Sequence, residues 1–168
     1  NGQLFNDVAV SATNFNQELR LTKNERLDKV VEIVCQSDES FIIWVKQNEE
    51  ADALRQLIPA AVEVRGNDSI DKKESTLLAF ANGEIKRLIT KAKMTSMGLN
   101  WQHCNHSVFF PTWSYEQYYQ AIRRFWRFGQ KNAVTCDMVI SDGQTRVLEA
   151  LQQKTKKAIE LHKSLTEN

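Results

Sequence analysis

The hydrophobic residues of this chain fall into short blocks whose spacing alternates between that of helices and that of strands. Residues 22–35 place apolar side chains at helical intervals, and residues 41–45, FIIWV, form an unbroken apolar run that is typical of a strand buried on both faces. The same criteria predict helices over 48–57, 69–81, 114–127 and from 142 almost to the C-terminus, and strands over 61–64, 87–90, 107–110 and 133–140.

This alternation predicts an α/β fold, a three-layer parallel sheet with helices on both faces. Ligands of such sheets bind at the carboxyl ends of the strands, so the loops after Val45, Val64, Thr90 and Phe110 are the candidate positions for a site. Residues 1–20 are polar and aperiodic, and we expect them to form a linker or arm from a preceding unit. Residues 21–168 then form one domain.

Composition and charge narrow the class of protein. The 22 Lys and Arg residues nearly balance 21 Asp and Glu, which leaves a formal charge of +1 and excludes a strongly basic tail or a charge-driven membrane binder. Any contact with nucleic acid must therefore come from a local patch. No apolar run approaches the ~18 residues that cross a bilayer. We expect a soluble, cytoplasmic domain with no membrane contact.

The three cysteines form no CxxC pair, which argues against a disulfide framework. The segment His103-Cys104-Asn105-His106 has the ligand types of zinc. Structural zinc usually takes four ligands in spaced pairs, and no second pair stands elsewhere in the sequence. We therefore predict an ordinary loop-to-strand junction here and no metal site.

The most informative stretch is residues 113–130, WSYEQYYQAIRRFWRFGQ. At about 100° per residue on a helix, the core face is predicted to hold Tyr115, Tyr119, Ile122 and Trp126. The opposite face carries Gln117, Gln120, Arg124 and Arg127. Two guanidiniums one turn apart suit a polyanion such as a phosphate chain. From the residues alone, a solvated helix face is the alternative.

Residues 120–130, QAIRRFWRFGQ, resemble the sixth helicase motif of superfamily 2 helicases and translocases, most of all that of the Snf-type branch and its bacterial and phage relatives. The motif there is Q-A-x-G-R-x-x-R-x-G-Q, and the matching positions are Gln120, Arg124, Arg127, Gly129 and Gln130. Residues 88–100, which end in Gly98-Leu99-Asn100, are similar to motif V, and residues 41–59 to motif IV. The resemblance spans about residues 25–160 and implies the second of two RecA-like lobes.

For the nucleotide, the resemblance implies that ATP and Mg²⁺ lie between two lobes and are held mainly by the N-terminal helicase lobe of the same polypeptide. Arg124 and Arg127 would be arginine fingers, with Arg127 nearer the γ-phosphate, and Gln120, Gly98 and Asn100 would contact the nucleotide. The chain contains no GxxxxGK[ST] loop, so this lobe alone is expected to be inactive as an ATP-dependent helicase or translocase.

For nucleic acid, the resemblance implies a track across both lobes that contacts the DNA backbone with little sequence specificity. Thr90, Lys91 and Lys93 stand at a strand's carboxyl end, where they can donate to phosphates. From the residues alone, a solvated loop explains these three positions equally well.

Two departures from the family pattern keep other functions open. Arg123 stands where the motif has Gly, and residues 93–96, KMTS, stand where Snf-type members carry Lys-Ala-Gly-Gly. These departures favour a second hypothesis, a non-catalytic module that binds nucleic acid or protein through a degenerate helicase lobe. A third, a phosphate-binding α/β enzyme of another family, explains the arginines but not Gly98-Leu99-Asn100. Unwinding and translocation along a duplex remain equally open.

Overall fold

The computed structural model describes residues 17, 20–91, 94, 103–110, 119, 130–140 and 145–166. Its elements are α2 (Lys23–Cys35), β1 (Phe41–Trp44), α3 (Asn48–Leu57), β2 (Ala61–Glu63), α4 (Ile70–Ala81), β3 (Arg87–Thr90), β4 (His106–Phe109), β5 (Thr135–Met138) and α6 (Thr145–Thr166). The predicted helix over 48–57 and strand over 87–90 have these bounds, and the other described elements begin or end within a few residues of the prediction. The predicted helix over 114–127 lies outside the described residues except at Tyr119.

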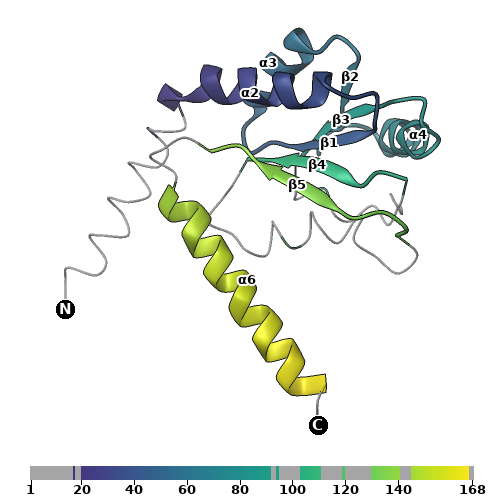
Figure 1. Cartoon of the computed structure of the whole chain (residues 1–168). Coiled ribbons are helices and arrows are strands. Elements are labelled where there is room, and N and C mark those ends of the chain that lie inside the picture. The colour runs from purple at the N-terminus through teal and green to yellow at the C-terminus, as the bar shows by residue number, and fades with distance from the viewer. Residues whose placement is uncertain are drawn as a thin grey trace.

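The strands form one parallel sheet in the order β2-β3-β1-β4-β5 (Figure 1). β1 lies at its centre, where Phe41 is in register with Arg87 on one side and with His106 on the other. Parallel neighbours need crossover connections, which α3 and α4 supply between β1, β2 and β3. The predicted parallel sheet is confirmed.

Alternate side chains of β1 enter two separate cores. Phe41 and Ile43 pack in one core with α2 and α3, and Ile42 and Trp44 pack in the other with Phe80 of α4. All four side chains of β1 are buried, as the unbroken apolar run predicts. Helices therefore cover both faces of the sheet, and the predicted three-layer arrangement is confirmed (Figure 1).

At the amino edge of the sheet, the side chain of Arg87 at the start of β3 donates hydrogen bonds to the end of α2 and to the chain that follows it. Its Nη2 donates to the carbonyl of Val34, 2.6 Å away, and its guanidinium also donates to the carbonyls of Ser37 and Glu39. A cation at the C-terminal end of α2 satisfies carbonyls that the helix leaves without partners. Arg87 therefore anchors α2 to the end of the sheet opposite the candidate loops.

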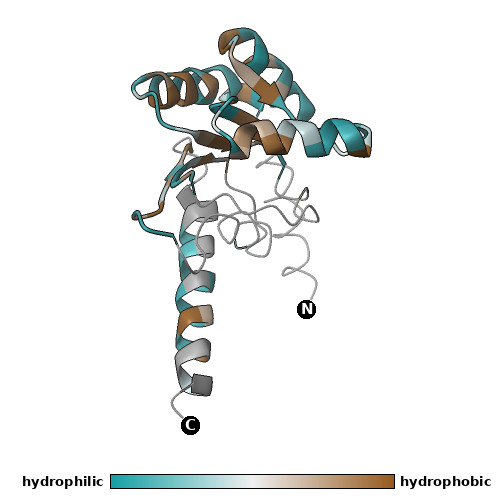
Figure 2. Ribbon diagram, turned by 90° about the vertical axis from the view of Figure 1, so that its right-hand side faces the viewer, coloured by the Kyte–Doolittle hydropathy of each residue, from teal (hydrophilic) through white to brown (hydrophobic). Residues whose placement is uncertain are grey.

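Helix α6 extends away from the layered sheet as a single rod in both views (Figures 1 and 2). Its described side chains include the exposed apolar residues Ile159 and Leu161. Among the residues the structure describes, no helix has the length and apolar character needed to cross a membrane.

The prediction that Tyr119 belongs to the core is wrong, because this side chain is 40% exposed. A tyrosine presents an apolar ring and a polar hydroxyl, so helical spacing alone does not decide whether it is buried or stays in contact with water.

Candidate functional site

The carboxyl ends of the inner strands meet at one edge of the sheet. The amide of Val45 donates to the carbonyl of Thr90 (3.0 Å), and the amide of Phe110 donates to the carbonyl of Trp44 (3.1 Å). Pairing therefore continues one residue beyond β1 and β4 and aligns the points where their loops begin. This is the edge at which the sequence predicts a site.

Thr90 and Lys91 lie together at this edge. Thr90 is buried, and its hydroxyl donates to the carbonyl of Val64 at 3.3 Å, so a contact with a phosphate would require this hydrogen bond to open. Lys91 Nζ donates to Oδ1 of Asn48, the first residue of α3, at 2.7 Å. The side chain of Lys91 therefore connects the end of β3 to the loop that follows β1.

The loop after β1 is held by the carboxylate of Glu50. Glu50 Oε2 accepts hydrogen bonds from the amides of Lys46 (2.9 Å) and Gln47 (3.0 Å), and Gln47 and Glu50 form a reciprocal capping box at the start of α3. Burial lowers the pKa of Lys46 below its ordinary value, while Glu50 acts in the opposite direction. The loop thus presents a half-buried cation on a constrained backbone.

The loop after β2 is also internally bonded. The amide of Arg65 donates to Asp68 Oδ2 (2.8 Å), and Lys72 Nζ donates to Asp68 Oδ1 (2.7 Å), so Lys72 lowers the pKa of Asp68. Lys73 Nζ donates to the carbonyl of Gly66 (2.6 Å). This loop therefore brings two lysines of α4 to the same edge as Lys91.

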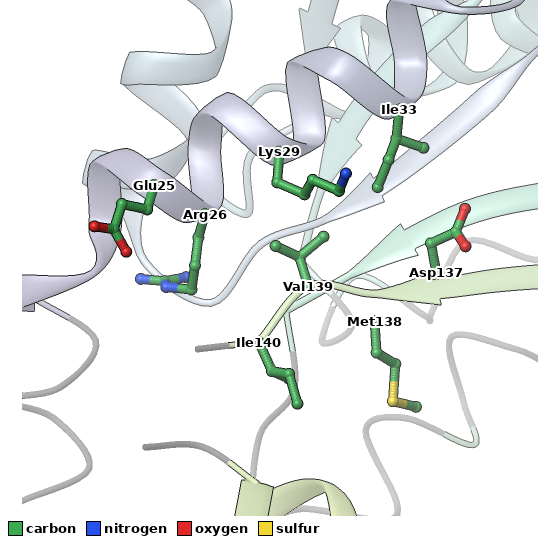
Figure 3. A pocket seen from close by; sticks show the side chains of 8 residues that line it. All are labelled: Glu25, Arg26, Lys29, Ile33, Asp137, Met138, Val139 and Ile140. Atoms are coloured by element: carbon green, nitrogen blue, oxygen red, sulfur yellow. The ribbon is translucent and has the colours of Figure 1, made fainter. Parts of the chain in front are cut away.

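A pocket of about 330 Å³ opens between α2 and the end of β5 (Figure 3). Arg26 and Lys29 project into it from α2, and Asp137 and Met138 leave β5 on opposite sides. The remaining lining residues are Glu25, Ile33, Val139 and Ile140.

Comparison with known proteins assigns the chain, including the loops at this edge, to a family. The family model described as the helicase conserved C-terminal domain matches residues 22–129, which include the loops after β1, β2 and β3. The chain belongs to this family. A helicase conserved C-terminal domain is a component of helicase-type ATPases. The parallel sheet of this chain is the sheet expected of a RecA-like lobe.

Known relatives extend beyond this domain. The chain is 26% identical to the bifunctional helicase and thymine dioxygenase JBP2 of Leishmania infantum and 25% identical to that of Leishmania major, over 88% of this chain in both cases. It spans only 15% of the length of these curated relatives.

Solved structures show the same fold. S. cerevisiae Dbp5 bound to RNA and ADP BeF3 superimposes with a TM-score of 0.66 at 21% identity, over 78% of this chain and 36% of that one. The C-terminal part of the Fun30 ATPase domain also gives 0.66, at 14% identity, over 75% of this chain and 44% of that one. The predicted RecA-like helicase C-terminal lobe is confirmed.

The structure of this helicase domain brings two of the predicted site residues, Thr90 and Lys91, to the expected edge. The other six lie outside the described residues, so their roles stay predictions: Lys93, Gly98, Asn100, Gln120, Arg124 and Arg127.

The rings of His103 and His106 have different partners. The ring of His103 lies edge-on to that of Phe80, and burial lowers its pKa. The Cys104 thiol is buried, which raises its pKa to about 11, and His106 Nε2 lies 2.5 Å from Asp137 Oδ2. Among the residues that the structure describes, no group of three or more His, Cys, Asp or Glu side chains could hold a metal ion.

Sequence reasoning missed Asn48, which accepts from Lys91, and the ion pair between Arg26 and Glu50. Arg26 and Glu50 stand 24 residues apart, on helices whose other charged side chains are mostly exposed. Nothing in the local sequence distinguishes these two from ordinary surface charges.

Proposed function

We propose that this chain is the second motor lobe of an ATP-dependent DNA helicase or translocase of superfamily 2, on the Snf-type branch or among its bacterial and phage relatives. The observation that carries the proposal is that Arg124 and Arg127 fall inside the family match over 22–129 and keep the order of the sixth helicase motif. Residues 1–20 would be the connection from a preceding lobe, and residues 21–168 the domain itself.

The contribution of this lobe to ATP hydrolysis would be positive charge. Arg127, assisted by Arg124, would neutralise the charge that grows on the γ-phosphate, while Gln120, Gly98 and Asn100 would contact the nucleotide. ATP and Mg²⁺ would be held mainly by the preceding lobe, where the metal neutralises phosphate charge. The printed sequence contains no GxxxxGK[ST] loop, which supports this division.

The contribution to nucleic-acid binding would come from the carboxyl edge of the sheet, through Lys91 and Lys93, with Thr90 at the strand end. The Lys91 ammonium is held in place by Asn48, and Lys72 and Lys73 of α4, which bond to the loop after β2, lie at the same edge. The curated relatives are named helicases and thymine dioxygenases. Since thymine is a base of DNA, this favours DNA over RNA as the partner.

Replacing Lys91 by alanine in the full parent polypeptide should weaken DNA binding for all sequences alike and reduce the slope of log K against log salt by about 1. The physical reason is the loss of one cation that neutralises a phosphate. The measurement is a salt titration of binding to two unrelated duplexes. Lys86→Ala is the matched control, because Lys86 is exposed at the amino end of the same strand. Equal effects of the two substitutions would contradict the assignment of the edge.

The function is tested by measuring ATP hydrolysis by the full parent polypeptide alone and with duplex DNA, single-stranded DNA or RNA. The proposal expects turnover that DNA stimulates. Stimulation by RNA and not by DNA would support the ATP-dependent motor but contradict DNA as its partner.

A second candidate function is a non-catalytic module that binds nucleic acid or protein. It is favoured by Arg123 in place of the motif's Gly and by KMTS at residues 93–96. A parent polypeptide that binds DNA and hydrolyses no ATP under any of these conditions would establish this alternative.

A further inference from the structure

A buried ion pair joins α2 and α3 at the carboxyl edge of the sheet. Arg26 Nη1 of α2 lies 3.1 Å from Glu50 Oε1 of α3, and the side chains are 2% and 0% exposed. Removing one partner of such a pair leaves an uncompensated charge in the interior, which is strongly unfavourable. The two side chains are therefore constrained to keep their contact when either helix shifts.

On the Glu50 side, the pair is bonded to the loop after β1. The second carboxylate oxygen of Glu50 accepts from the amides of Lys46 and Gln47, and the next residue, Asn48, holds the Lys91 ammonium. A displacement of this loop by a bound nucleic-acid backbone would therefore be transmitted to the carboxylate.

On the Arg26 side, the pair contacts the end of β4. The guanidinium carbon of Arg26 lies 4.9 Å from the centroid of the Phe110 ring, and Nε donates to the hydroxyl of Thr22 at 3.3 Å. In the sequence, Arg124 and Arg127 follow Phe110 by 14 and 17 residues. Thr22 lies at the start of α2, next to the chain that enters the domain. Arg26 also lines the pocket at the end of β5 (Figure 3).

We infer that Arg26 and Glu50 are positioning residues that couple the nucleic-acid edge of this lobe to Phe110 at the end of β4, and thereby couple DNA binding to ATP hydrolysis. The inference rests on the proposed function. Movement of the loop after β1 on DNA binding would shift Glu50, and the ion pair would carry the shift through Arg26 to Phe110. A close-packed interior transmits such a displacement instead of absorbing it.

The test is the double variant Arg26→Met/Glu50→Gln in the full parent polypeptide. Removing both charges leaves no buried ion unpaired, and the Gln oxygen still accepts from the two backbone amides, so the fold is retained. At saturating DNA, the stimulation of ATP hydrolysis should fall about tenfold, the scale of a typical coupling between sites. The Kd for DNA and the KM for ATP should stay within about twofold of wild type, because no group that touches either ligand is changed.

The matched control is Lys29→Met/Glu32→Gln. It removes an ion pair of α2 in which Lys29 Nζ lies 2.9 Å from Glu32 Oε2 and both side chains are more than half exposed. It should leave the stimulation unchanged. Arg26→Lys provides a second variant that keeps the buried charge but lacks the planar group over Phe110. It should lose part of the stimulation in a folded protein.

Wild-type stimulation in the folded double variant would overturn the inference while leaving the motor intact. A wild-type parent whose ATP hydrolysis does not respond to DNA would overturn the proposed function first, and the inference with it. A proportional loss of DNA affinity in the double variant would also overturn the inference, because it would place the pair in binding instead of coupling.

Discussion

Replacing Arg127 by alanine in the full parent polypeptide should lower kcat for DNA-stimulated ATP hydrolysis by about 10³-fold or more. A guanidinium near the γ-phosphate stabilises charge that develops mainly in the transition state, so its removal slows the chemical step more than it weakens ATP binding. KM for ATP should therefore change far less than kcat. The measurement is steady-state hydrolysis at saturating DNA over a range of ATP concentrations.

Two further variants make this result specific. Arg123→Ala is the matched control, because Arg123 stands at a position where the helicase motif has Gly and is assigned no contact with phosphate. It should keep most of the activity. Arg127→Lys should restore only part of it, since an ammonium lacks the planar, forked donors of a guanidinium. Similar losses from Arg123→Ala and Arg127→Ala would contradict the assignment of the finger to Arg127, because the effect would not be specific to the motif position.

Replacing Glu50 by alanine should reduce the free energy of unfolding by about 3–5 kcal/mol. The substitution leaves the buried guanidinium of Arg26 without its carboxylate and removes the acceptor of the Lys46 and Gln47 amides. The measurement is urea denaturation of the 168-residue chain, followed by tryptophan fluorescence.

Glu49→Ala is the control for this prediction, because Glu49 is exposed in the same first turn of α3. Its effect should stay within about 0.5 kcal/mol, the usual range for surface substitutions. If the two alanine variants are equally stable, the buried ion pair contributes nothing to folding. Glu50→Gln should be less destabilising than Glu50→Ala, since it keeps an oxygen that accepts from the two amides.

Local signals explain why several elements could be predicted with their bounds. The helix over 48–57 has its apolar residues on one face and is followed by Pro59, and the strand over 87–90 is a short run that contains Leu88 and Ile89. Both signals lie within a few residues of the element they define. The failure at Tyr119 has the opposite cause, because burial of an amphipathic side chain depends on what packs against it.

Some features of the candidate site could likewise be predicted from the sequence, and others could not. Motif order within residues 88–100 and 120–130 is a property of the sequence, and it led to the family that the match over 22–129 confirms. The partners of Lys91 and Arg26 are 43 and 24 residues away along the chain. No local pattern encodes either contact.

The sequence by itself therefore determined the succession of the described helices and strands, the parallel character of the sheet and the helicase family, because periodicity and motif order are local. The strand order β2-β3-β1-β4-β5, the bond between Lys91 and Asn48 and the burial of Arg26 with Glu50 were decided only by the tertiary structure. These features arise when distant segments exclude water from one another, and the energy of a buried charge depends on the partner that the fold brings to it.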